Sequence, residues 1–156
     1  MSVLIRNMKP ADLDAVFSIA TYLPQAPQWP RSGYDRALET AETGRRIALV
    51  AEIAPGETAG FAILSMVPPE AELESIGVAA PFQRRGIGRA LLAYIYGECM
   101  AHGCTDLILE VRESNQAAQA LYRAAGFQLS GRRPGYYSFP AEDALLFRRE
   151  LVSPEK

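Results

Sequence analysis

The chain reads Gln83-Arg84-Arg85-Gly86-Ile87-Gly88-Arg89 at the point where an apolar, strand-like segment gives way to a helix-like one. The segment before it is Leu73 to Val78, and the segment after it is Ala90 to Met100. Two glycines one residue apart leave backbone N–H groups uncovered at a helix N-terminus, where anions bind. Three arginines there oppose the helix macrodipole by roughly 0.3–1 kcal/mol each, which a bound polyanion would offset. The stretch indicates an anion site, and a solvated basic turn is the alternative.

Two common phosphate-binding loops do not match this stretch. A P-loop requires Lys and Ser or Thr after its second glycine, whereas Arg89 and Ala90 follow Gly88. The dinucleotide fingerprint requires a third small residue where Leu91 stands, and an acidic residue about twenty positions further on. Nucleotide binding through this loop is therefore disfavoured.

The composition is that of an ordinary globular protein. A length of 156 residues predicts one domain over residues 1–156. A charged fraction of 22% and a net charge of −2 favour neither nucleic acid nor a membrane surface as a partner. There is no signal-peptide pattern and no apolar run of about 18 residues, so no membrane span is expected.

Two cysteines, Cys99 and Cys104, are too few for a disulfide framework and favour a reducing, cytoplasmic setting. With His102 they offer three metal ligands within six residues. Because the spacing suits no usual zinc pattern, no metal is expected.

The order of elements follows from apolar periodicity and from the turn residues between the periodic segments. Gly77 lies inside an expected strand, where glycine indicates a bulge or the close approach of another backbone. Ser114 or Asn115 is the expected cap of the last helix. The expected strands are 2–6, 46–54, 59–67, 72–78, 105–111, 127–130 and 144–151, with helices from 10 to about 22 and over 34–43, 86–102 and 116–125. Regular structure is not expected in the Pro/Trp segment after the first helix, nor in the Gly/Pro/Tyr-rich segment between the last two strands, and the whole pattern predicts a three-layer α/β domain.

Several motifs together resemble the GCN5-related N-acetyltransferase (GNAT) family. They are Glu74-Ser75-Ile76-Gly77-Val78, the stretch Gln83 to Leu92, Leu109-Glu110-Val111-Arg112-Glu113-Ser114-Asn115 and the segment Ala120 to Phe127, in the family's order and spacing. Arg132 to Tyr137 followed by Glu142-Asp143-Ala144 is similar to one subgroup, the ribosomal-protein alanine N-acetyltransferases (RimI-like). The resemblance covers about half of the chain. It implies a mixed central sheet of about seven strands flanked by about four helices, in three layers.

The resemblance implies that acetyl-CoA binds as the acetyl donor. Ile76 and Val78 resemble the strand whose backbone pairs with the pantetheine arm, with Gly77 marking the bulge that splays the strands. Asn115 resembles a further cofactor contact, and it also fits a helix cap. The residues similar to the pyrophosphate loop are Arg84, Arg85, Gly86, Ile87, Gly88 and Arg89.

Catalysis in this family is the attack of an amine on a thioester. An α-amino group is about 10–15% neutral at pH 7, whereas a lysine is neutral in about one molecule in 2,500, so an N-terminal acceptor asks less of a base. Glu110, at the end of a strand, is the candidate base, and a solvent-facing glutamate is the alternative. Tyr122 is the candidate acid for the leaving thiolate, and a core aromatic is the alternative. Glu74 is the alternative base.

The acceptor is expected to bind between the Tyr22 to Gly33 loop and the Arg133 to Tyr137 loop. Trp29, Tyr136 and Tyr137 either line a slot for a peptide backbone or pack against their own segments. The first hypothesis is acetylation of a protein N-terminus, such as that of a ribosomal protein. The alternatives are a small-molecule amine or a lysine as acceptor, or a non-catalytic acyl-CoA-binding module.

Overall fold

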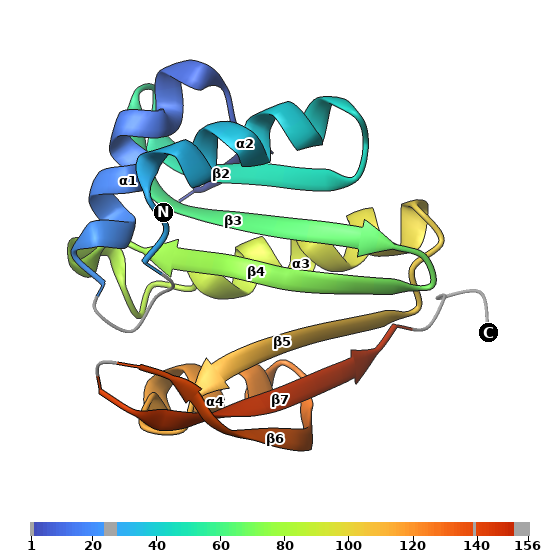
Figure 1. Ribbon diagram of the computed structural model, residues 1–156. Coiled ribbons are helices and arrows are strands. Elements are labelled where there is room, and N and C mark those ends of the chain that lie inside the picture. The colour runs from blue at the N-terminus through green and yellow to red at the C-terminus, as the bar shows by residue number, and fades with distance from the viewer. Residues whose placement is uncertain (1, 24–27, 139, 152–156) are drawn as a thin grey trace.

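The computed structural model describes residues 2–23, 28–138 and 140–151, in which seven strands form one mixed sheet (Figure 1). The sheet order is β1-β2-β3-β4-β5-β7-β6, with β4 and β5 parallel and the other neighbours antiparallel. The strands are β1 (Leu4–Asn7), β2 (Arg46–Ala54), β3 (Glu57–Val67), β4 (Glu70–Val78), β5 (Asp106–Arg112), β6 (Gln128–Tyr137) and β7 (Glu142–Glu150). The α-helices are α1 (Leu13–Thr21), α2 (Arg31–Glu42), α3 (Ile87–Ala101) and α4 (Gln116–Ala124), and short 3-10 turns cover Pro10–Asp12 and Ala80–Phe82.

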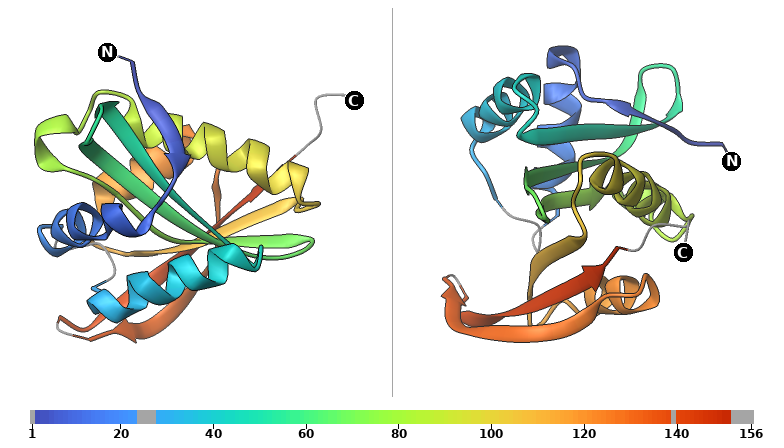
Figure 2. Two further views of the ribbon diagram at one scale, coloured as in Figure 1. Left: turned by 90° about the horizontal axis from the view of Figure 1, so that it is seen from above. Right: turned by 90° about the vertical axis from the view of Figure 1, so that its right-hand side faces the viewer.

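Helices cover both faces of the sheet, α1 and α2 on one and α3 and α4 on the other (Figures 1 and 2). Side chains alternate between the faces of a strand, so neighbours enter different cores. Leu49 and Ala62 belong to the core beneath α3 and α4, whereas Val50 and Phe61 belong to the core beneath α1 and α2. The expected three-layer α/β architecture is confirmed. No helix among the described residues is long and apolar enough to cross a membrane.

Strands β4 and β5 pair along only part of their length and then diverge (Figure 1). Their register runs from Glu70 opposite Asp106 to Leu73 opposite Leu109, although β4 continues to Val78. Against β3, Leu73 lies opposite Leu64 and Ser75 lies opposite Ile63, so Glu74 is an extra residue. This bulge bends β4 where the two strands part.

The expected bulge at Gly77 is wrong. Gly77 lies opposite Phe61 in regular register with β3, three residues beyond the actual bulge at Glu74. A Cβ at position 77 would lie 2.7 Å from Phe61 Cε1 and 2.8 Å from Leu23 Cδ1, too close for a side chain. Glycine is required here by two side chains that press onto the strand.

Helix α2 begins at Arg31 rather than at the expected Tyr34. Pro30 stands just before the first helical residue in an extended conformation, so it precedes the helix without interrupting it. The Gly33 amide donates to the Pro30 carbonyl at 2.8 Å and closes the first turn. The expected loop residues 24–27 lie outside the described residues.

Strand β6 extends through the segment that was expected to be a Gly/Pro/Tyr-rich loop. Arg132 and Arg133 pair with Leu145 and Ala144 of β7, and pairing resumes at Tyr137 after a register shift. Because β6 lies at the sheet edge, Pro134 can stand in it without losing a ladder hydrogen bond. The Pro-Gly signal therefore marks an irregularity in an edge strand, and a second shift near Ser130 also blunts that edge.

Arg6 of β1 joins the first strand, the first turn and β2. Its NH1 and NH2 groups each bind Asp12 at 2.8 Å, and its Nε binds Glu52 at 3.0 Å. The carboxylate of Asp12 also accepts the Lys9 amide at 2.7 Å, and the residue is only 8% exposed. The Arg6 guanidinium holds the pKa of Asp12 below its usual value.

Replacing Arg6 should show how much its contacts with Asp12 and Glu52 contribute to the free energy of unfolding. Arg6→Met should lower the free energy of unfolding by about 2–3 kcal/mol at pH 7, because it leaves a buried carboxylate without its cation. The lowered pKa of Asp12 stabilises the fold above the ordinary pKa of 3.8, and this contribution is lost as the pH falls. Urea denaturation should therefore show a smaller difference in unfolding free energy between wild type and Arg6→Met at pH 3 than at pH 7. Arg36→Met on α2 is the control, and an equal loss at both pH values would contradict the account.

Candidate functional site

The loop before α3 holds two left-handed residues. Arg84 has φ 63° and Gly86, the N-cap residue of α3, has φ 84°. A left-handed non-glycine residue costs about 1–2 kcal/mol, and such strain gathers at ligand sites. Ala90 N–H donates to Gly86 at 3.0 Å and begins the helical ladder, so the amides of Ile87, Gly88 and Arg89 have no acceptor within the helix. The loop has the geometry of an anion site.

The side chains of this loop take different directions. Ile87 is 1% exposed and anchors the loop in the core beneath α3, so only its backbone is available to a ligand. The Arg85 guanidinium lies 5.9 Å from the Phe82 ring centroid. Arg89 borders a hollow of about 170 Å³ between α3 and α4. The other residues that line this hollow are Leu92, Ala93, Tyr96, Ala124 and Ala125.

The far half of β4 presents a free backbone edge toward β5. Beyond Leu73 the strand still pairs with β3, but its pairing with β5 has ended. An extended ligand can therefore add to this edge as a strand would. The Val78 carbonyl accepts a hydrogen bond from Gln83 Nε2 at 3.0 Å. This bond connects the loop before α3 to the end of β4. Pairing of a ligand with Ile76 and Val78 stays a prediction.

Asn115 caps helix α4, as one of its two interpretations predicted. Its Oδ1 accepts the Ala118 amide at 3.1 Å. The cap fixes the start of the helix that carries Tyr122. A contact between Asn115 and a cofactor stays a prediction.

Glu110 lies on the face of β5 opposite α3 and α4. Its neighbours Leu109 and Val111 point into the core beneath those helices, and alternation turns Glu110 to the other face. The Glu110 side chain is 18% exposed, and Arg133 NH2 lies 3.6 Å from its Oε1. Glu110 directly follows the last residue of β5 that pairs with β4. It therefore stands where the two strands part.

Tyr122 lies on α4, on the opposite face of the sheet. It is 6% exposed within the core beneath α3 and α4, and its ring packs edge-on against Phe127 with 5.6 Å between centroids. Burial, followed by the charges of Tyr137 and Tyr96, raises the pKa of Tyr122. The phenol therefore keeps its proton at neutral pH. The structure places a carboxylate and a protonated phenol on the two sides of β5.

Tyr136 and Tyr137 lie beside Glu110 at the end of β6. Their ring centroids are 5.1 Å apart. The Arg133 Cζ lies 5.5 Å from the Tyr136 ring centroid, and the Arg112 Cζ lies 4.2 Å from the Tyr137 ring centroid. The negative charge of Glu110 raises the pKa of Tyr136, and burial together with Glu110 raises that of Tyr137. The predicted acceptor residues of this segment and the predicted base are thus brought together.

Trp29 and Glu74 meet through a shared arginine. The Trp29 ring packs against Tyr34 with 5.2 Å between centroids, and Arg46 lies 5.8 Å from the Trp29 ring centroid. Arg46 also binds both carboxylate oxygens of Glu74, at 2.7 and 2.9 Å. Glu74, the alternative base, is thereby committed to an ion pair. A direct contact between Trp29 and an acceptor stays a prediction.

Glu72 of β4 interacts electrostatically with Glu110, and the sequence interpretation did not single it out. The Glu72 residue is exposed, but desolvation by its neighbours, followed by the charges of Glu110 and Glu74, raises its pKa. The available signal was the spacing of Glu72 and Glu74, because residues two apart share one face of a strand. The approach of Glu110 from β5 had no sequence signal, since it depends on the parallel pairing of β4 with β5.

The two cysteines are buried away from these residues, in the core beneath α3 and α4. Burial raises the pKa of Cys99 to about 12. His102 Nδ1 lies 2.8 Å from the Glu98 carbonyl oxygen. Over residues 2–23, 28–138 and 140–151, no group of three or more His, Cys, Asp or Glu side chains could hold a metal.

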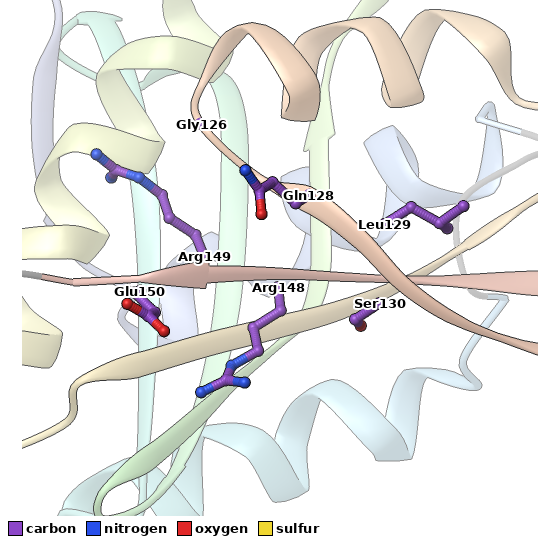
Figure 3. Close-up of a pocket in the computed structure, with 7 residues that line it drawn as sticks. All are labelled: Gly126, Gln128, Leu129, Ser130, Arg148, Arg149 and Glu150. Carbon is purple, nitrogen blue, oxygen red and sulfur yellow. The ribbon is translucent and has the colours of Figure 1, made fainter.

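A larger hollow of about 510 Å³ lies along the β6–β7 hairpin, apart from the predicted site residues (Figure 3). Arg148 pairs with Asp106 at 3.0 Å, and Arg149 lies 4.0 Å from the Tyr96 ring centroid. These cations already have partners, and Figure 3 shows them on opposite sides of the hairpin. The residues that line the hollow are Gly126, Gln128, Leu129, Ser130, Arg148, Arg149 and Glu150.

Known proteins resemble this chain in sequence. The [ribosomal protein bS18]-alanine N-acetyltransferase of Escherichia coli (strain K12) is 44% identical over 58% of this chain and 63% of its own length. The N-alpha-acetyltransferase RimI of Mycobacterium tuberculosis is 38% identical over 81% of this chain and 78% of its own length. An uncharacterized protein of Mycobacterium leprae is 36% identical over 95% of this chain, which spans only 41% of that relative. The chain thus spans less than two thirds of the length of two of these relatives.

The fold and the sequence pattern lead to the same family. The crystal structure of the ribosomal-protein-S18-alanine N-acetyltransferase from Escherichia coli superimposes with a TM-score of 0.83 at 31% identity, over 97% of this chain and 96% of that one. The acetyltransferase (GNAT) family pattern matches residues 14–127. This match covers most of the sheet, the loop before α3 and the helix that carries Tyr122. The chain belongs to the acetyltransferase (GNAT) family.

Proposed function

We propose that this protein is an acetyl-CoA-dependent N-acetyltransferase whose acceptor is the α-amino group of a protein N-terminus. The observation that carries the proposal is the parting of β4 from β5 beyond Leu73 and Leu109, with Glu110 on one face and Tyr122 on the other. The Escherichia coli and Mycobacterium tuberculosis relatives, both named as N-acetyltransferases, support it.

The donor fits the residues on the α3 side of the sheet. The amides of Ile87, Gly88 and Arg89 would hold its diphosphate, because they lack acceptors within α3 and lie at the positive end of its dipole. The free edge of β4 near Ile76 would hold its extended arm. The donor supplies an acetyl group activated as a thioester.

Glu110 would remove a proton from the attacking amine. An α-ammonium group loses its proton far more readily than a lysine, so a carboxylate in a partly buried position suffices. The α-ammonium group first loses one proton to water. As the N–C bond forms and the C–S bond breaks, Glu110 would take the second proton from the nitrogen and later release it to solvent, while Tyr122 would give its proton to the sulfur and regain one from solvent. A phenol is protonated at neutral pH in any case, and burial raises the pKa of Tyr122 further. The products are an amide and a thiol.

The acceptor would bind on the opposite face, beside Glu72, Glu110 and the pair Tyr136 and Tyr137. Carboxylates on this face attract an ammonium group, and aromatic rings provide contact area for the following peptide bond. A ribosomal-protein N-terminus is the acceptor named for the Escherichia coli relative. Such an acceptor and the buried thiols of Cys99 and Cys104 fit a cytoplasmic protein.

Turnover by two conservative variants tests the function. The wild-type protein should release thiol when acetyl-CoA is mixed with peptides that begin with alanine. Glu110→Gln and Tyr122→Phe should each lower kcat by about 100-fold, the range of a lost general base or acid, with the affinity for acetyl-CoA unchanged. Glu57→Gln, at the exposed first residue of β3, and Tyr94→Phe, on the exposed face of α3, are the matched controls.

Other results would redirect the proposal. Transfer to free small amines or to lysine peptides, with none to N-terminal peptides, would replace the acceptor. Calorimetric binding of acetyl-CoA without turnover, and variants equal to wild type, would indicate a non-catalytic binding module. Absence of binding would overturn the proposal.

Glu72 on the proposed acceptor face should also make the stability of the fold depend on pH. The pKa of Glu72 is raised above the ordinary 4.5, so the folded chain binds the carboxyl proton of Glu72 more tightly than the unfolded chain does. The folded chain therefore loses stability as the pH rises from about 4.5 through the raised pKa. Glu72→Gln avoids this loss. The variant should be more stable than wild type by a few tenths of a kcal/mol, at most about 1, at pH 7. The difference should vanish near pH 4.

Thermal unfolding from pH 4 to pH 8 measures this effect, with Glu39→Gln on the exposed face of α2 as control. A variant that is less stable than wild type at pH 7 would show that Glu72 is held by a cation rather than crowded by Glu110 and Glu74.

A further inference from the structure

We propose that Arg46 is a positioning residue that fastens Trp29 to the bulge at Glu74 and thereby sets the shape of the acceptor side. The acceptor part of this inference rests on the proposed function. The fastening itself is a property of the fold and can be measured without turnover.

The ion pair between Arg46 and Glu74 crosses over β3, the strand between β2 and β4. Arg46 lies on β2 opposite Ser65 of β3, and Glu74 lies on the next strand, β4. The Nε–Oε1 distance is 2.7 Å and the NH2–Oε2 distance is 2.9 Å, a two-point fork that fixes the direction of both side chains. The side chains are only 21% and 19% exposed. Such a pair resists both water and movement better than a surface pair does.

Glu74 is the extra residue of the bulge, so its anchor holds the bulge in place. A shift of the bulge by one residue would turn neighbouring side chains to the other face of β4. Ser75, now buried at 3% exposure, and Ile76, at the free edge, would exchange faces. The fork to Arg46 opposes that shift because a move of Glu74 would break both of its hydrogen bonds.

Trp29 completes the connection on the helix side. Its ring lies between Arg46 and Tyr34, and a Cβ on Gly33 would lie only 3.3 Å from the Trp29 Cβ, so the first turn of α2 also confines it. The preceding residue, Gln28, donates through Nε2 to the carbonyls of Ala20 and Leu23, at 3.1 and 2.9 Å. The described residues on either side of 24–27 are thus held to helix α1 and to Arg46.

This connection touches β4 at two points on the face that carries α1 and α2. Arg46 reaches Glu74, and Leu23 Cδ1 lies where a side chain on Gly77 would stand. The charge of Glu74 also raises the pKa of Glu72 on the same strand. The loop before α3 belongs to the other face. Loosening Arg46 should therefore weaken acceptor binding. Donor binding should stay near that of the wild type as long as the bulge keeps its register, because Ile76, at the edge proposed for the donor arm, changes face only when the register shifts.

Two substitutions at one position separate these effects, and Trp29 is the chain's single tryptophan, so its emission reports its packing directly. Arg46→Gln should shift the emission to the red, raise acrylamide quenching by about 2-fold and raise the KM for an alanine peptide by about 10-fold, as expected for a lost charged fork. Its dissociation constant for acetyl-CoA should stay within about 2-fold of wild type. Arg46→Lys should give smaller changes, because lysine keeps the charge without the fork or the flat stacking surface. The control is Arg45→Gln, at the exposed neighbouring position.

These measurements test the fastening of Trp29 and the role of Arg46 in acceptor binding separately. Wild-type emission and quenching in Arg46→Gln would overturn the fastening of Trp29. A changed emission with a wild-type peptide KM would overturn the role in acceptor binding, and an equal loss of acetyl-CoA affinity would reveal a merely structural role. Failure of the proposed function would appear in the wild-type protein as absence of transfer to peptides, and the emission of Arg46→Gln would still decide whether Arg46 holds Trp29.

Discussion

The pairing of β4 with β5 ends after four residues, and the site depends on that limit. Two parallel strands that stay paired leave no backbone edge free and no passage between the faces of a sheet. The extra residue Glu74 bends β4 away at this point, while β5 turns to pair with β7 along its whole length. The opening is thus built into the hydrogen-bond register, and the surrounding cores of α1–α2 and α3–α4 hold it from both faces.

The two faces at this opening differ in chemistry. On the α3 side, helix amides without intrahelical acceptors and a buried phenol suit an anionic donor with a leaving thiolate. On the other side, Glu72 and Glu110 with two tyrosines suit a cationic acceptor. Under the proposed function, these groups would favour a different substrate on each face, and Glu110 and Tyr122 would handle the proton of the amine and that of the thiol separately.

Local signals were sufficient where a residue acts through its own backbone or its immediate neighbours. The start of α3 beside Gly86 and the cap Asn115 each follow from a preference that a few adjacent residues express. The same reasoning failed at Gly77, where the actual constraint comes from Phe61 and Leu23, and at Pro134, where the edge position of β6 makes a proline tolerable.

The sequence by itself determined the order of strands and helices, the family resemblance and the glycine-containing turn before α3, because periodicity and turn chemistry act over short distances along the chain. Only the tertiary structure decided that the bulge is at Glu74, that Arg46 occupies this carboxylate, and that Glu72 stands beside Glu110. Residues 46 and 74, or 72 and 110, meet through strand pairing across the sheet. Such contacts depend on which strands become neighbours and in which register, and the burial of both cores sets that choice.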